Sequence, residues 1–82
     1  MDADGNTPLH YACTSNKLVI VEYLLKKNAD PNTQDAAGWT PFHAAASDRN
    51  YTICEVLLKN KADPTIKNNS NSVGFSYLAR AE

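Results

Sequence analysis

The sequence is poor in the residues that most often carry cross-links or chemistry. Its 82 residues include only two cysteines, two histidines, three glycines and one tryptophan. Two cysteines are too few for the disulfide framework of a small secreted domain, and we expect both, Cys13 and Cys54, to face a core. This pattern predicts a reducing intracellular compartment, cytoplasmic or nuclear. Glycosylation sequons beginning at Asn50 and Asn68 leave a secreted context as the alternative.

Clusters of one charge and long apolar runs are also missing. Eight basic and nine acidic residues give a formal net charge of −1, and the longest basic run is the pair Lys26-Lys27. Binding to nucleic acid or to an anionic membrane needs clustered Lys and Arg, so we expect neither partner. No apolar run approaches the roughly 18 residues of a membrane span, and the charged start is unlike a signal peptide. Direct membrane insertion is therefore not expected.

The sequence does contain an internal repeat. Thr7-Pro8-Leu9-His10 recurs as Thr40-Pro41-Phe42-His43, at an offset of 40 − 7 = 33 residues. The same register pairs Leu24-Leu25-Lys26 with Leu57-Leu58-Lys59, and Ala29-Asp30-Pro31 with Ala62-Asp63-Pro64. A period of this length is the mark of a stacked-repeat protein. It predicts units at about 2–34 and 35–67 and a partial unit at 68–82.

Each full unit predicts two short antiparallel helices. Thr7 can cap a helix through its hydroxyl, and Pro8 suits the first helical position. We expect helices at about 8–15 and 18–27, and by repetition at about 41–48 and 51–60. The apolar face of the second helix should carry Ile20, Val21, Leu24 and Leu25. None of these helices is long enough to be stable alone, so they must pack together.

Some positions depart from the repeat. Lys61 follows the last helix at a position where a left-handed backbone costs lysine about 1 kcal/mol, so the helix either ends differently there or is followed by a looser loop. The repeat register places a finger at residues 68–72, although their composition is loop-forming and disorder-prone, and the capping motif is absent after them. We expect only a short helix there, with Phe75, Leu78 and Ala79 on its apolar side. Because stable stacks generally need three or more units, we expect this segment to belong to a longer array.

Thr-Pro-Leu-His-x-Ala at a 33-residue spacing resembles the ankyrin repeat family, over almost the whole chain. The resemblance implies an all-α solenoid of antiparallel helix pairs joined by hairpin-like finger loops. It also implies that each His hydrogen-bonds the neighbouring Thr and backbone and ties unit to unit. The structural framework would then be Thr7, Pro8, His10, Thr40, Pro41 and His43. Finally, it makes Asn32 a candidate for hydroxylation by an oxygen-sensing dioxygenase.

The sequence offers little evidence of a catalytic site or a metal site. His10 and Cys13 could place two metal ligands on one helix, but the residue one period after Cys13 is Ala46. A general acid and base need paired carboxylates, or a His beside a nucleophile, whereas the acidic residues here are scattered. The sequence has no Gly-rich phosphate loop and no zinc-type Cys pairing. We therefore expect no enzyme activity, no cofactor and no metal.

The expected function is binding of another protein through the concave face of fingers and first helices. Side chains there vary between units because the framework residues carry the packing. The candidate binding residues are Asp4, Asn6, Tyr11, Thr14, Ser15, Ala36, Trp39, Ser47 and Asp48. Trp39 is the strongest because large aromatics often anchor interfaces, although it could instead fold back over its own finger.

Two other functions stay open. The segment could regulate or target a larger enzyme, channel or transferase whose chemistry lies outside these residues. It could also be a spacer within a long solenoid. In every case we expect flanking ankyrin repeats in the parent chain.

Overall fold

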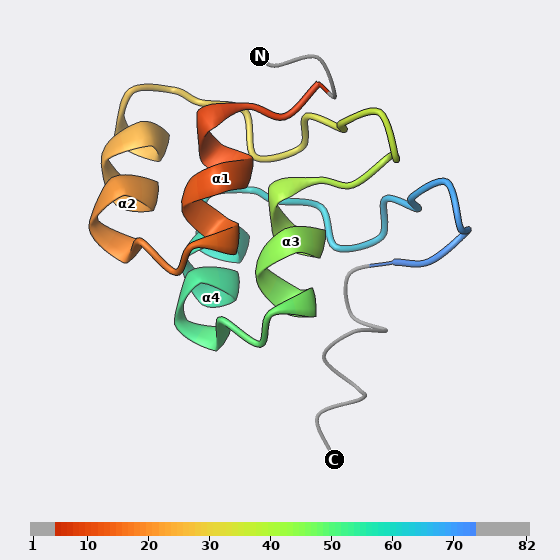
Figure 1. Cartoon of the computed structure of the whole chain (residues 1–82). Helices are drawn as coiled ribbons and strands as arrows, with labels where there is room; N and C mark the ends of the chain where they lie inside the picture. The colour runs from red at the N-terminus through yellow and green to blue at the C-terminus, as the bar shows by residue number, and fades with distance from the viewer. Residues whose placement is uncertain (1–4, 74–82) are drawn as a thin grey trace.

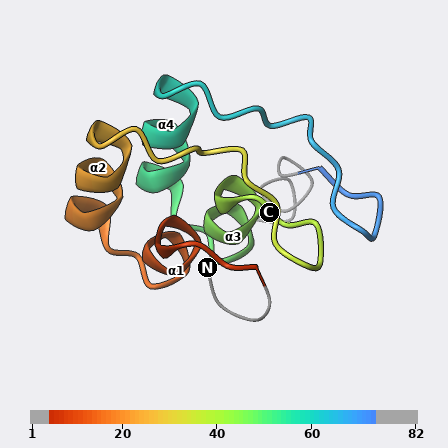
Figure 2. The ribbon, with the colours of Figure 1, turned by 90° about the horizontal axis from the view of Figure 1, so that it is seen from above.

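Figure 1 shows the computed structural model, in which residues 5–73 are described. Within these residues the chain forms four helices and no strand: α1 (Pro8–Thr14), α2 (Leu18–Lys26), α3 (Pro41–Ser47) and α4 (Tyr51–Lys59). α1 packs on α2 and α3 packs on α4, while α1 also contacts α3 and α2 contacts α4. Two antiparallel helix pairs therefore stand side by side, with long loops extending away from them (Figures 1 and 2). The all-α prediction is confirmed.

The first helix of each pair begins with the same reciprocal cap. The hydroxyls of Thr7 and Thr40 accept a hydrogen bond of 3.3 Å from the backbone N–H of His10 and His43. In return, the Nδ1 atom of each His accepts one from the backbone N–H of its Thr, at 3.0 and 3.1 Å. This capping box satisfies two donors that a helix start leaves without partners. Each predicted helix ends one residue earlier in the structure, which is within the usual uncertainty of helix boundaries.

The second helices begin without a side-chain cap and depend on packing. Their N-terminal flanking residues are Lys17 and Asn50, and neither caps its own helix. The Asn50 side chain instead donates a hydrogen bond of 2.7 Å to the carbonyl of Cys13, near the end of α1. This contact joins the turn of the second unit to the first unit.

A single apolar core lies among the four helices, and one prediction about it is wrong. Its most buried side chains include Leu9, Cys13, Val21, Phe42, Ile53 and Leu57. Ile20, expected on the buried face of α2, is 49% exposed, although its repeat counterpart Ile53 is 0% exposed. Leu24 is likewise only partly buried, whereas its counterpart Leu57 is fully buried. The first unit covers this face of the second unit, but no described residue covers it on the first.

The loops after the helices use left-handed backbone at repeated positions. Asn28 and Lys61, one period apart, have φ angles of 70° and 73°. Asn16 and Arg49, in the turns between the helices of each pair, have φ angles of 56° and 59°. Lys61 therefore adopts the strained conformation itself, and α4 ends in the same way as α2.

The third finger repeats the second, despite its different composition. In residues 35–39 the Oδ1 atom of Asp35 accepts hydrogen bonds of 2.9 Å from the N–H groups of Ala37 and Trp39. In residues 68–72 the Oδ1 atom of Asn68 accepts from Ser70 and Ser72, at 2.9 and 3.0 Å. Asn68 is only 5% exposed, so this segment is an ordered turn organised by a buried side chain. The short helix expected through Phe75, Leu78 and Ala79 lies outside the described residues.

Candidate functional site

The two histidines connect the first helix of each unit to the finger of the next. The Nε2 atom of His10 lies 2.8 Å from the carbonyl oxygen of Trp39, and that of His43 lies 3.0 Å from the carbonyl oxygen of Ser72. Because Nδ1 accepts from the backbone N–H of Thr, the geometry assigns the ring proton to Nε2, which donates to the carbonyl. Both rings are almost completely buried. Each finger is thereby held by the unit before it.

Neighbouring fingers are also bonded to each other. The backbone N–H of Asn69 donates to the carbonyl of Ala37, and its side-chain Nδ2 donates to that of Ala36, both at 2.9 Å. The Gln34 side chain donates to the carbonyls of Gly38 and Lys67, at 3.0 and 3.1 Å. The fingers at 35–39 and 68–72 therefore form one connected edge rather than two independent loops.

Asn32, the residue considered for hydroxylation, has a structural role. Its Nδ2 atom donates to the carbonyl of Lys61 at 3.2 Å, and its Oδ1 atom accepts from the N–H of Asp63 at 2.7 Å. Its backbone N–H is bound to the Asp30 carboxylate at 2.8 Å. The side chain thus bridges the two units where their second helices end.

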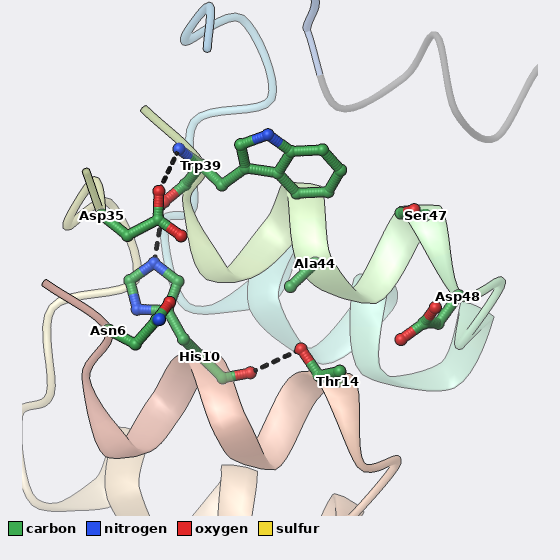
Figure 3. A pocket seen from close by; sticks show the side chains of 8 residues that line it. All are labelled: Asn6, His10, Thr14, Asp35, Trp39, Ala44, Ser47 and Asp48. Carbon is green, nitrogen blue, oxygen red and sulfur yellow. Dashed lines mark hydrogen bonds between the residues drawn. The ribbon is translucent and has the colours of Figure 1, made fainter. Parts of the chain in front are cut away.

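A hollow lies on the side of the fingers and first helices, between the two units (Figure 3). It has a volume of about 210 Å³. The predicted binding residues that line it are Asn6, Thr14, Trp39, Ser47 and Asp48. Three more lining residues were not predicted as binding residues: His10, Asp35 and Ala44. The repeat register offers one signal for the hollow, because Ala44 stands where the first unit has the much larger Tyr11.

The other predicted binding residues lie elsewhere. Tyr11, which is 53% exposed, and Ser15 line a different hollow at the outer face of the first unit, together with Pro8 and Ile20. Ala36 is exposed on its finger, and its carbonyl accepts the bond from Asn69. Asp4 lies outside the described residues.

Trp39 is neither fully exposed nor buried. Its ring centroid lies 5.7 Å from that of His43, with the two ring planes tilted by 49°. The indole therefore rests partly on its own unit while another part of its surface faces the hollow (Figure 3).

Among the described residues that line the hollow, the charged side chains are both acidic, Asp35 and Asp48. The Asp35 carboxylate is occupied on one oxygen by two backbone N–H groups. Asp48 is exposed, and its carboxylate makes no hydrogen bond or ion pair with any residue in 5–73. No Lys or Arg is among the lining residues within 5–73. The site is acceptor-rich, with an aromatic wall.

The structure gives the remaining chemical groups no reactive arrangement. Burial raises the pKa of the Cys13 thiol to about 12 and that of the Cys54 thiol to about 11, so both stay protonated near neutral pH. Among residues 5–73, no group of three or more His, Cys, Asp or Glu side chains is placed to hold a metal ion. In the same range, none of the helices has the length and apolar content of a bilayer crossing.

Comparison with known proteins identifies a family and a relative. The family model described as ankyrin repeats (3 copies) matches residues 1–68. The "Ankyrin repeat and LEM domain-containing protein 1 homolog" of Caenorhabditis elegans is 49% identical over 35 residues. That match covers 43% of this chain and 5% of the relative, so the shared segment is a small part of the relative's length.

Proposed function

The chain belongs to the ankyrin repeat family, whose repeats generally serve as protein-interaction modules, and we propose that this segment binds a partner protein through its fingers and first helices. Units at about 2–34, 35–67 and 68–82 would form part of a longer array in an intracellular protein. The segment itself would carry no enzyme activity.

The observation that carries the proposal is the hollow between the units. Residues from both units line it, including Asn6 and Thr14 from the first and Trp39 and Asp48 from the second. The fingers beside it are held by the hydrogen bond from the His10 ring to the carbonyl of Trp39 and by the bonds that Asn69 donates to the carbonyls of Ala36 and Ala37. Because this framework is ordered before any partner arrives, binding would lose little conformational entropy.

A photo-cross-linking experiment tests the proposal. A photoreactive amino acid replaces Ser47, which is exposed at the hollow, or Glu55, which is exposed on the outer helix α4. In cells that produce the parent protein, cross-linked partners are expected from position 47 and not from position 55. The affinity of a captured partner should then fall when Trp39 is replaced by Ala, roughly tenfold or more if Trp39 is an anchor.

Two results would contradict this function. One is cross-linking from position 55 alone, which would place the partner on the outer helices. The other is unchanged affinity in the folded Trp39→Ala variant together with no cross-link from position 47. The second result would favour the spacer alternative.

The outer face of the first unit supports the proposal that another unit precedes it. Its exposed or half-buried residues Pro8, Ile20, Leu24 and Ala29 correspond to Pro41, Ile53, Leu57 and Ala62, all of which are buried. Two hollows lie on this face: Leu9, Leu24 and Ala29 line one, and Pro8, Ala12 and Ile20 line the other. A preceding ankyrin unit would cover the face as the first unit covers the second.

A further inference from the structure

The hollow between the units has the shape and chemistry to receive one cationic side chain. We propose that it binds an arginine of the partner protein, with the guanidinium group between the Trp39 ring and the Asp48 carboxylate. This inference rests on the proposed function, since it assigns the partner chemistry recognised at the same face.

The hydrogen-bonding groups around the hollow favour a donor-rich ligand. The Thr14 hydroxyl donates its proton to the His10 carbonyl at 3.0 Å, so it offers only lone pairs to a ligand. The Oδ1 atom of Asp35 is bound to two N–H groups, while its Oδ2 atom makes no hydrogen bond within residues 5–73. Together with Asp48, these groups present acceptors at both ends of the hollow (Figure 3). An arginine supplies five donors and a delocalised positive charge.

Asp48 has no structural reason to be acidic. It is the C-terminal flanking residue of α3, where the helix dipole disfavours a negative charge. Its exposed carboxylate makes no compensating contact within the described chain. A carboxylate in this position therefore gains nothing from the fold and is available for a positively charged ligand.

The walls of the hollow favour arginine over lysine. The indole of Trp39 stands on one side, and the small side chain of Ala44 lies between Trp39 and Thr14 (Figure 3). The planar guanidinium can stack on an aromatic face while its edge bonds to carboxylates, whereas the compact ammonium of lysine is more strongly hydrated. The first unit has Asn6 and Tyr11 where the second has Trp39 and Ala44. The equivalent place on the first unit therefore lacks both the indole wall and the space beside a small side chain.

A peptide titration followed by ¹H–¹⁵N NMR tests the assignment on the whole 82-residue chain. The probes are the blocked tripeptide Gly-Arg-Gly and the same peptide with citrulline or lysine in place of arginine. Citrulline keeps the shape of arginine without its charge. The arginine peptide is expected to bind in the millimolar range and to shift the Trp39 indole and the Ala44, Ser47 and Asp48 amides.

Matched variants identify the binding groups. Asp48→Asn, which removes charge at nearly constant shape, should weaken arginine binding about threefold to fivefold, while Glu55→Gln on the outer helix should not change it. Ala44→Tyr should abolish binding by filling the hollow. The ¹H–¹⁵N spectrum of this variant reports whether it folds, and if it does not, Asp48→Asn alone carries the test.

Several results would overturn the arginine assignment. These are equal binding of the citrulline peptide, equal or tighter binding of the lysine peptide, shifts away from the hollow, or no shift at all. The titration does not involve the natural partner. Its failure would therefore leave the cross-link from position 47 as independent support for protein binding, and a failed cross-link would leave the arginine result standing.

Discussion

At the scale of single residues, each of the two histidines connects a helix cap to the finger of the next unit. Each ring bonds to its own Thr on one side and to the next finger's carbonyl on the other. A neutral imidazole is well suited to this position because it is a donor and an acceptor on opposite sides of one small ring. Both rings are almost completely buried, so the loss of either bond would leave a poorly hydrated polar group without its partner.

Replacing His43 by Ala should lower the free energy of unfolding by about 2–3 kcal/mol, because the ring loses both its bond to the N–H of Thr40 and its bond to the carbonyl of Ser72. Urea denaturation measures this loss. Hydrogen exchange should also become faster at the Asn69 and Ser72 amides, which belong to the finger that His43 holds. Ser47→Ala, at an exposed position in the same helix, is the control and should change little. Unchanged hydrogen exchange at these amides would show that the His43 ring does not hold the finger.

The two buried thiols should be unreactive in the folded chain and should affect its stability at high pH. Their pKa values of about 12 and 11 lie above the ordinary value of 9.0. An unfolded thiol loses its proton at lower pH than a folded one, so stability is unaffected below pH 9 and falls as the pH rises toward 11. Substituting both Cys13 and Cys54 by Ala should reduce this fall, as measured by urea denaturation at several pH values. Rapid thiol labelling of native protein at neutral pH would contradict their burial.

At the scale of elements, the loops after α2 and α4 show how one backbone geometry is kept by different residues. Asn28 and Lys61 have nearly the same φ angle. Asparagine tolerates this left-handed conformation, whereas it is costly for lysine. Comparing substitutions at these two positions therefore measures the cost of a left-handed backbone for lysine.

Lys61→Gly should raise the free energy of unfolding by about 1 kcal/mol, because glycine adopts positive φ without a steric penalty. Asn28→Gly at the equivalent position should give a smaller gain. Chemical denaturation of the two variants, compared under the same conditions, measures both effects. An equal gain at the two positions would mean that the lysine is not the strained member of the pair.

The sequence predicts the starts of α1 and α3 well because the signals for them are local. Thr and Pro determine where α1 and α3 begin, whatever surrounds them. The burial of Ile20 is not predictable from periodicity, since an apolar stripe shows which face seeks cover but not whether another unit covers it. The register predicts a finger at 68–72, whereas its disorder-prone composition hides the ordered turn: Asn68 replaces Asp35 and still supplies the oxygen that organises it. The hollow depends on Asn6 and Thr14 of the first unit lying opposite Trp39 and Ala44 of the second, which no local motif reveals.

At the scale of the whole molecule, the two helix pairs have nearly the same sequence pattern but different surroundings. The second unit is covered by the first, whereas the corresponding face of the first is open within residues 5–73. Ile20 and Ile53 thus form a matched pair with the same side chain at the same register position. Their exposed fractions, 49% for Ile20 and 0% for Ile53, show how much of this side chain one inter-unit contact covers.

Ile53→Ala should destabilise the chain by about 2–5 kcal/mol through lost burial and a cavity, whereas Ile20→Ala should cost about 1 kcal/mol or less. Thermal and urea unfolding of the 82-residue chain measure both. In the parent protein, with a preceding unit in place, the cost of Ile20→Ala should approach that of Ile53→Ala. A persistent difference there would count against a covering unit.

The hydrogen bonds between units join residues 29 to 37 positions apart. An insertion of one or two residues in a finger would therefore change the separation of every bonded pair that spans it. Insertion of a complete period would instead give each new donor an equivalent acceptor one unit along. Such a chain can lengthen by duplication of whole 33-residue segments, and the genetic changes that it tolerates best are those that add or remove a full unit.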